Sequence, residues 1–209
     1  MKLISSIALY LNLYKASVVP VILCFMFYYQ NFSDEAFVYL SLHGTYSFIW
    51  FLKYLWFPDV AFKSRISFAK GFSLIFLTSL GYYIAPFLLI SKNIHVTGYY
   101  LAIVLSVYSI GMFFLYVSDM QKFYTLKYKS GLITEGLFSR TRNPNYFGEI
   151  LVYFSLAMLS THWLPFVVLT IFICFIFMKN MKQKDIHLSE LSGFKEYKEQ
   201  TWLVFPKFF

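Results

Sequence analysis

Long apolar runs recur along this chain, and they constrain its fold more than any other feature. A helix needs about 20 predominantly apolar residues to cross the hydrocarbon core of a bilayer. Four runs meet or approach that length: Ala16 to Phe32, Ala36 to Phe57, Gly71 to Ile90 and Thr97 to Val117. The composition agrees, because 59% of the residues are hydrophobic and only 13% are charged, whereas about a quarter of a soluble domain is charged. The chain is therefore expected to be an integral membrane protein.

A further apolar region, Tyr146 to Met178, is too long for one ordinary span. The sequence Thr161-His-Trp-Leu-Pro165 interrupts it, and proline disfavours helix both at its own position and just before it. We therefore expect a tight helical hairpin, with arms from Tyr146 to Ser160 and from Leu164 to Met178. Together these spans predict an all-α fold, a polytopic transmembrane bundle of about six helices. We expect one integral membrane domain, in which residues 1–117 form four spans and residues 118–209 form a catalytic region with a cytoplasmic tail.

The basic residues are distributed very unevenly over the loops of this layout. If the chain crosses the bilayer at each expected span, 17 of the 18 lysines and arginines fall on one side. Only Lys92 falls on the other side, together with Asp34 and Glu35. Basic loops stay on the cytoplasmic side, so both chain ends are expected to be cytoplasmic, in a bacterial inner membrane or the endoplasmic reticulum. This topology accounts for the net charge of +8 without a nucleic-acid partner.

Two cytoplasmic segments are too rich in polar residues to be simple connectors: Ser118 to Glu149 and Lys179 to Phe209. They flank the hairpin, so both can reach its cytoplasmic mouth. A site there would have apolar walls and polar donors, which suits a substrate dissolved in lipid and a cofactor dissolved in water. The four histidines are scattered and the two cysteines lie in apolar stretches, so no metal site is expected. The sequence favours no particular oligomeric state.

The densest polar run precedes the hairpin, from Ser139 to Glu149. Pro144 suits the first turn of a helix, which would place Asn145 and Glu149 on one face. Glu149 would then lie at membrane depth, where an ionisable group is costly and usually functional. The alternative is an ordinary helix start, with Asn143 as its cap and Glu149 favoured by the helix dipole.

Residues Arg142-Asn-Pro-Asn-Tyr-Phe-Gly-Glu149 resemble the R-x-P-N-Y-x-G-E signature of a membrane-enzyme superfamily. It contains isoprenylcysteine carboxyl methyltransferases, phospholipid methyltransferases and the steroid 5-alpha-reductase and sterol reductase families. Asn143 stands where histidine is usual. The signature implies the superfamily without implying which reaction is catalysed.

Three further segments resemble the steroid 5-alpha-reductase branch, so the resemblance extends over Ser118 to Phe209. They are Ser118-Asp119-Met-Gln-Lys122, the turn Gly131 to Phe138, and the tail Gly193 to Thr201 followed by Phe205-Pro206. The resemblance implies that Asp119 binds the NADPH nucleotide. Alternatively, Asp119 and Lys122 form a solvated helix end, and the tail is an amphipathic helix on the lipid surface.

Within the second span, His43, Tyr46, Trp50 and Lys53 recur at about helical spacing, which predicts that they share one face. A histidine at membrane depth is a candidate proton donor. The alternative for His43 is a buried histidine whose ring is satisfied by a hydroxyl group.

Cofactor chemistry separates the two branches. NADPH carries phosphates, which lysine and arginine bind, whereas the sulfonium of S-adenosylmethionine requires acidic residues. The stretch Lys179 to His187 holds three lysines and a single carboxylate, Asp185, which favours NADPH.

We therefore expect an NADPH-dependent membrane reductase that adds hydride to an enone or a similar lipophilic substrate from the bilayer. The expected cofactor-binding residues are Asp119, Arg142, Asn145, Lys179 and His187. The expected catalytic residues are Glu149 beside the nicotinamide and Tyr46, His43 or Tyr146 as the acid. A methyltransferase using S-adenosylmethionine and a non-catalytic membrane protein of the same fold are the alternatives.

Overall fold

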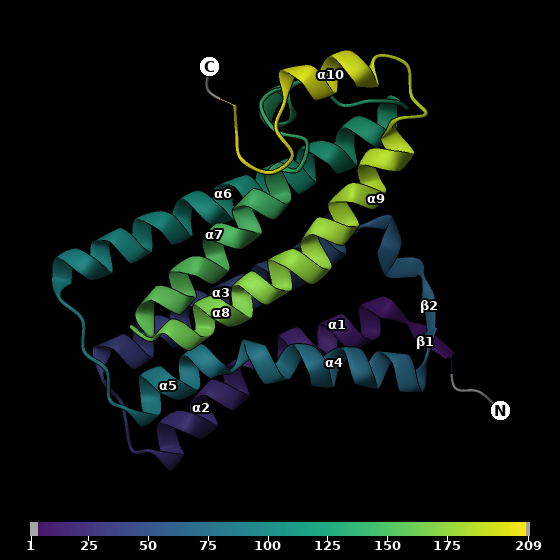
Figure 1. Ribbon diagram of the computed structural model, residues 1–209. Helices are drawn as coiled ribbons and strands as arrows, with labels where there is room; N and C mark the ends of the chain where they lie inside the picture. The colour runs from purple at the N-terminus through teal and green to yellow at the C-terminus, as the bar shows by residue number, and fades with distance from the viewer. Residues whose placement is uncertain (1–3, 208–209) are drawn as a thin grey trace. The chain divides into compact units, whose positions relative to one another are not determined.

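The computed structural model describes residues 4–207 (Figure 1). The fold is helical, as predicted, apart from one short pair of strands. The described residues form two compact units. The first unit comprises the chain up to Val104 together with Leu156–Phe166, and the second comprises Leu105–Ser155 together with the chain from Val167 onward. The expected division between residues 117 and 118 falls within a single continuous helix.

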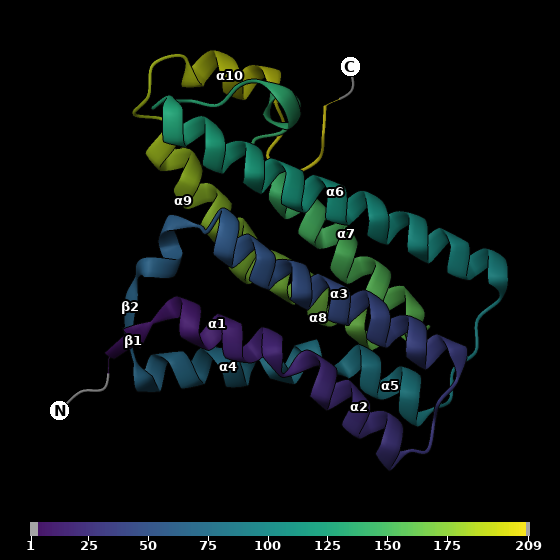
Figure 2. The ribbon, with the colours of Figure 1, turned by 180° about the vertical axis from the view of Figure 1, so that it is seen from behind.

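Five helices form most of the first unit: α1 (Ile7–Ala16), α2 (Val18–Tyr28), α3 (Asp34–Trp56), α4 (Phe68–Tyr82) and α5 (Ile84–Ser91). Helix α1 packs against α3 and α4, and α2 packs against α3 and α5 (Figure 2). Helix α3 begins where Ser33 accepts a hydrogen bond from the backbone N–H of Ala36, a typical N-cap.

A short antiparallel ribbon closes one end of the first unit, and the sequence did not predict it. Strands β1 (Ile4–Ser6) and β2 (Arg65–Ser67) pair with Ile4 opposite Ser67. The short helix η1 (Val60–Lys63) precedes β2.

The expected span Gly71 to Ile90 is broken, and the first expected span is separated from the helix that precedes it; each break lies three residues before a proline. Ser17 separates α1 from α2 ahead of Pro20, and Tyr83 separates α4 from α5 ahead of Pro86. Proline lacks the N–H that would bond to the preceding turn, and its ring crowds that turn. The helix therefore bends or restarts at these positions.

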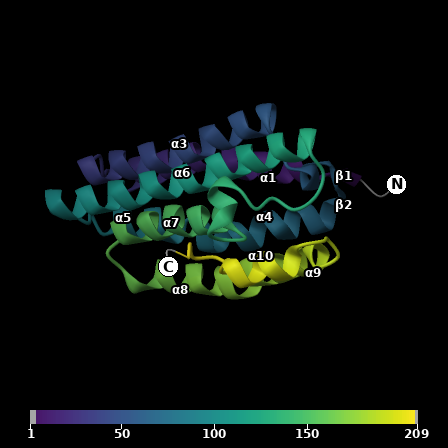
Figure 3. The same ribbon diagram turned by 90° about the horizontal axis from the view of Figure 1, so that it is seen from above.

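The second unit contains the polar segments and the helices that hold them. Its elements are most of α6 (Gly98–Tyr128), η2 (Gly136–Ser139), most of α7 (Pro144–Leu159), the rest of α8 (Trp163–Phe172), the π-helical turn η3 (Ile173–Phe177), α9 (Met178–Leu188) and α10 (Phe194–Gln200). After α9 the chain turns and continues into the short helix α10 (Figure 3).

Within the second unit, α6 and α7 touch through their backbones at two glycines. A Cβ atom on Gly148 would lie 2.6 Å from the carbonyl oxygen of Gly111, and one on Gly111 would lie 2.8 Å from the backbone nitrogen of Val152. Gly148 was expected to permit a close approach, and the approaching partner is the backbone of α6.

Among the described residues, three helical stretches are long and apolar enough to cross a membrane: Ile7–Tyr28, Gly98–Tyr128 and Trp163–Leu188. The expected interruption before Pro165 is present, because α7 ends at Leu159 and α8 begins at Trp163. Thr161, in this turn, has a positive φ of 43°.

Candidate functional site

The residues just before α7 are held by the C-terminal segment Thr201–Lys207, which we call the tail strap. The backbone N–H of Arg142 donates to the carbonyl of Trp202 at 3.0 Å. The Thr141 hydroxyl donates to the carbonyl of Val204 at 2.8 Å, and the N–H of Lys207 donates to the carbonyl of Arg140 at 2.8 Å. The start of α7 is therefore fixed by backbone pairing with the far end of the chain.

Arg142 is buried beneath this strap, with only 6% of its surface exposed. Its Nε donates to both carboxylate oxygens of Asp185 on α9, at 3.0 and 3.1 Å. Its Nη1 donates to the carbonyl of Thr201 at 2.6 Å and to that of Lys198 at 3.3 Å. The side chain thus connects the start of α7 to α9 and to the tail strap.

Asn143 is fully buried and also joins two segments. Its Nδ2 donates to the carbonyl of Leu203 at 2.9 Å, while its Oδ1 accepts from Nζ of Lys184 at 3.1 Å. Nζ of Lys184 also donates to the carbonyl of Arg142 at 2.8 Å. The amide of Asn143 thus donates one hydrogen bond and accepts another. The asparagine that stands in place of the usual histidine therefore has a structural role.

Asp119 on α6 is buried, and Nζ of Lys122 lies 3.7 Å from its Oδ1. Lys184 lies within electrostatic range of Asp119, Lys122, Arg142 and Asp185. We call these five residues the mouth cluster. It contains three cationic and two anionic side chains, and one of the two carboxylates, Asp185, is bound by Arg142.

The first turns of α7 carry the remaining expected residues of this unit. Asn145 and Glu149 are half-buried and one turn apart, as predicted. Within the part of the chain that the structure describes, the Asn145 amide forms no hydrogen bond. Tyr146 packs on Phe177 of η3, with ring centroids 4.8 Å apart. The Tyr116 hydroxyl on α6 lies within electrostatic range of both Glu149 and Asp119.

His43 and Tyr46 belong to the first unit, where both are buried on α3. The predicted shared face is confirmed, because Lys53 is buried there too and Trp50 is half-buried. The His43 ring lies 4.5 Å from the ring of Tyr82, between centroids. The expected hydroxyl partner is not found, since neither ring nitrogen has a hydrogen-bond partner among the described residues.

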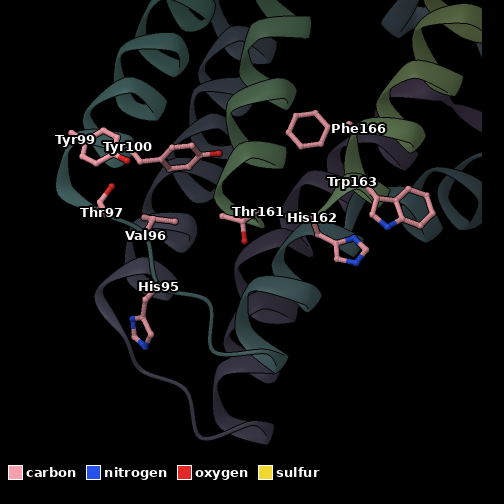
Figure 4. Close-up of a pocket in the computed structure, with 9 residues that line it drawn as sticks. All are labelled: His95, Val96, Thr97, Tyr99, Tyr100, Thr161, His162, Trp163 and Phe166. Carbon is pink, nitrogen blue, oxygen red and sulfur yellow. The ribbon is translucent and has the colours of Figure 1, made fainter.

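A hollow of about 570 Å³ also lies in the first unit, where the loop before α6 meets the turn before α8 (Figure 4). Its walls include Tyr99, Tyr100, Trp163 and Phe166. None of the expected site residues lines this hollow. The described residues contain no group of three or more His, Cys, Asp or Glu side chains that would suit a metal ion.

Comparison with protein families gives one match. The profile of a family of proteins of unknown function, DUF1295, matches residues 61–204. The chain belongs to the DUF1295 family. That family is related to steroid 5-alpha-reductase-like membrane proteins. Searches of curated proteins and of solved structures find no match.

The DUF1295 match includes the whole mouth cluster and leaves out α1, α2 and α3, the last of which carries His43 and Tyr46. Within the matched region, the structure brings Asp119 and Arg142 into one cluster. Of the other three expected cofactor residues, Asn145 is half-buried in the first turn of α7, whereas Lys179 and His187 are exposed on α9. Nδ1 of His187 lies 4.0 Å from a carboxylate oxygen of Glu190.

Three members of the mouth cluster, Lys122, Lys184 and Asp185, were not among the expected site residues, and the sequence holds a signal for Lys184. Its neighbour Asp185 follows the buried residues Phe177 and Met181 at intervals of four. Residues four apart share one face of a helix, so Phe177, Met181 and Asp185 lie on the same face. This face is directed toward α7 and brings Lys184 there with Asp185, whereas Lys179 lies on the exposed side. This helical spacing, counted from Phe177, would have selected Lys184 rather than Lys179.

Proposed function

We propose that this protein is a membrane-embedded, NADPH-dependent reductase of a lipophilic substrate with a polarised double bond, such as an enone. The observation that supports this most is the charge of the mouth cluster. Lys122, Lys184 and Arg142 gather beside the N-terminal end of α7, which itself carries a partial positive charge. Such a place suits the phosphates of a nucleotide.

The same charges disfavour S-adenosylmethionine. Its sulfonium and amino groups are cationic and need carboxylates nearby. The carboxylate that α9 offers at the cluster, Asp185, already binds Arg142 through both oxygens. The methyltransferase therefore remains the second candidate, and the buried Asp119 is the observation in its favour.

When bound, NADPH supplies a hydride to the β-carbon of the substrate. The Asn145 amide is placed to orient the carboxamide of the nicotinamide, because it is half-buried at the first turn of α7. Tyr146, the next residue, is our candidate for donating a hydrogen bond to the substrate carbonyl, where negative charge develops. Glu149 lies one turn beyond Asn145. The other two acids that the sequence suggested, His43 and Tyr46, belong to the first unit.

We further propose that the chain crosses the membrane six times, with both termini in the cytoplasm. The spans would be α1–α2, α3, α4–α5, α6, α7 and the continuous stretch from α8 to α9. This arrangement would collect 17 of the 18 lysines and arginines on the cytoplasmic side.

A thermal-shift titration of the detergent-purified protein with NADPH and, separately, with S-adenosylmethionine tests the proposal. A ligand that binds only the folded protein stabilises it by about 2.7 kcal/mol at a hundredfold excess over its dissociation constant. Stabilisation by NADPH alone is the expected result. Stabilisation by S-adenosylmethionine alone would replace the reductase by the methyltransferase, and no response to either would favour a non-catalytic protein.

The variant Asn145→Ala then tests the placement of the nicotinamide. We expect it to lose turnover with an unchanged melting temperature, because its amide holds no other described residue. Normal turnover in Asn145→Ala would rule out this placement.

A further inference from the structure

Two buried or half-buried cations, Arg142 just before α7 and Lys184 on α9, have different surroundings, and this separates their roles. Resting on the proposed use of a nucleotide cofactor, we propose that Lys184 contacts a phosphate of the cofactor, whereas Arg142 is a positioning residue that fixes the tail strap. The sequence predicted Arg142, Lys179 and His187 among the cofactor-binding residues and did not include Lys184.

Arg142 is already engaged within the protein. Its charge is neutralised by Asp185, whose two oxygens share the Nε–H, and its Nη1 donates to two carbonyl groups, those of Lys198 and Thr201. A guanidinium that binds a phosphate normally offers a pair of parallel N–H groups. Here Nε and Nη1 are committed to the contacts that hold α9 and Thr201 in place.

Lys184 differs because both of its hydrogen-bond acceptors are uncharged. Nζ donates to the carbonyl of Arg142 and to Oδ1 of Asn143. An ammonium has three donors, so this geometry leaves one for a ligand. The two contacts hold Nζ directly before Pro144, where α7 begins.

The surroundings of this ammonium favour an anion. Lys122 and Arg142 lie within electrostatic range of it, and the N-terminal end of α7 adds a partial positive charge. Arg142 is paired with Asp185, and Nζ of Lys122 lies 3.7 Å from Oδ1 of Asp119, so the five side chains of the mouth cluster keep a net charge of +1 at this half-buried helix end, which a bound anion would offset. A phosphate or pyrophosphate group has the charge and the acceptor oxygens that this arrangement requires.

The test compares Lys184→Met with Lys182→Met. Both changes remove one positive charge from α9, but Lys182 is exposed and makes no contact with another described residue. Each variant is titrated with NADPH and with inorganic pyrophosphate while its melting temperature is recorded. We expect Lys182→Met to behave like the wild type and Lys184→Met to bind both probes about tenfold more weakly or worse. Lys184→Arg, which keeps the charge, should restore most of the response.

Two variants separate a phosphate contact from a structural role. Arg142→Lys loses the separate Nε and Nη1 donors that reach Asp185 and the tail at once, so we expect a lower melting temperature without ligand and faster proteolytic cleavage of the tail, while a saturable response to pyrophosphate remains. If Lys184→Met and Arg142→Lys lose the response equally, the division of roles is wrong.

The two probes distinguish this inference from the proposed function. If pyrophosphate stabilises the wild type and not Lys184→Met, but NADPH stabilises neither, the anion site stands and the reductase proposal fails. If pyrophosphate stabilises Lys184→Met as much as the wild type, or does not stabilise the wild type, the assignment of Lys184 is overturned.

Discussion

At the scale of single residues, two buried polar side chains on α3, Ser47 and His43, differ in their hydrogen bonding from a buried serine on α7. Ser47 is 3% exposed, and its hydroxyl has no hydrogen-bond partner among the described residues; His43, one turn earlier, has the same property. Ser155 on α7 is equally buried, but its hydroxyl donates to the carbonyl of Val152 at 2.7 Å. A buried hydroxyl without a partner has lost its water contacts and gained nothing in exchange.

Ser47→Ala is therefore expected to raise the free energy of unfolding, by about 1 kcal/mol relative to the effect of Ser155→Ala. Both changes remove a buried hydroxyl from a helix and gain the same helix propensity, so their difference isolates the missing hydrogen bond. Thermal unfolding in detergent measures it. Equal effects of the two variants would mean that Ser47 has a partner in the native protein.

Glu35 gives a pH-dependent prediction. Burial raises the pKa of its carboxyl group, but hydrogen bonds from its own N–H and that of Val96, together with His95, outweigh this and hold the pKa below its ordinary value of 4.5. A lowered pKa means that the carboxylate adds stability above the unfolded-state value and loses it as the pH falls through the folded-state value.

We therefore expect Glu35→Gln to unfold more easily than the wild type at pH 7 and to match it once the pH is well below 4.5. His95→Gln should have a smaller effect, because its ring is largely exposed and solvent screens the pair. Unfolding temperatures between pH 3 and pH 7 measure both variants. A Glu35→Gln difference that does not change with pH would exclude this linkage.

At the scale of elements, the crossing of α6 and α7 places the site residues of the second unit. Gly148 and Gly111 let the two backbones touch, and Asp119 on α6 and Asn145 on α7 each lie about one turn from this contact. Gly98, at the start of α6, has nothing within 4 Å of the position of a Cβ atom.

Gly148→Ala is expected to destabilise the protein by about 1–3 kcal/mol, because the added methyl group meets backbone atoms that cannot rotate away. Gly98→Ala is the matched control and should be neutral or slightly stabilising. The melting temperatures of the two variants test this. If Gly148→Ala is as stable as Gly98→Ala, the helices do not touch there.

The elements also show which features a sequence can reveal. The span near residue 165 ends where Pro165 predicts, and the prolines at 20 and 86 explain the breaks at Ser17 and Tyr83 afterwards, since a proline acts on the turn before it.

The tail strap was not predictable. It pairs with residues about 60 positions away through backbone groups, which carry no residue-specific pattern. Arg142 was expected to bind the cofactor because it begins the signature, and the sequence did not reveal its partners within the chain, Asp185 and the carbonyl groups of Lys198 and Thr201.

At the scale of the whole molecule, the strongest sequence feature is the one-sided distribution of lysine and arginine. Three of the six proposed spans correspond to helical stretches of the described residues that are by themselves long and apolar enough to cross a membrane: Ile7–Tyr28, Gly98–Tyr128 and Trp163–Leu188. Helix α7 has 16 residues, which suffices for about 24 Å at 1.5 Å per residue. That is shorter than a hydrocarbon core of about 30 Å, so α7 would need the bilayer to thin or its polar first turn to reach the interface.

Single cysteines at three exposed positions test the crossing of α6 and α7 and the orientation of the chain. Cys24 and Cys174 are first replaced by alanine, and then Thr97, Ser130 or Thr161 is changed to cysteine, one at a time. In intact bacterial cells that express the protein, a membrane-impermeant maleimide should label the cysteines at positions 97 and 161. It should label the one at position 130 only after lysis, because the basic loop that contains Ser130 would be cytoplasmic.

Each alternative gives a different pattern. Labelling at position 130 alone would invert the topology and contradict the charge rule. Labelling at positions 97 and 130 would mean that α6 does not cross, despite its 31 residues. Labelling at position 97 alone would mean that α7 remains on the cytoplasmic side as an interfacial helix. In that case the polar first turn of α7, with Asn145 and Glu149, would face water rather than lipid, and a substrate dissolved in the cytoplasm would fit the site better than one taken from the bilayer.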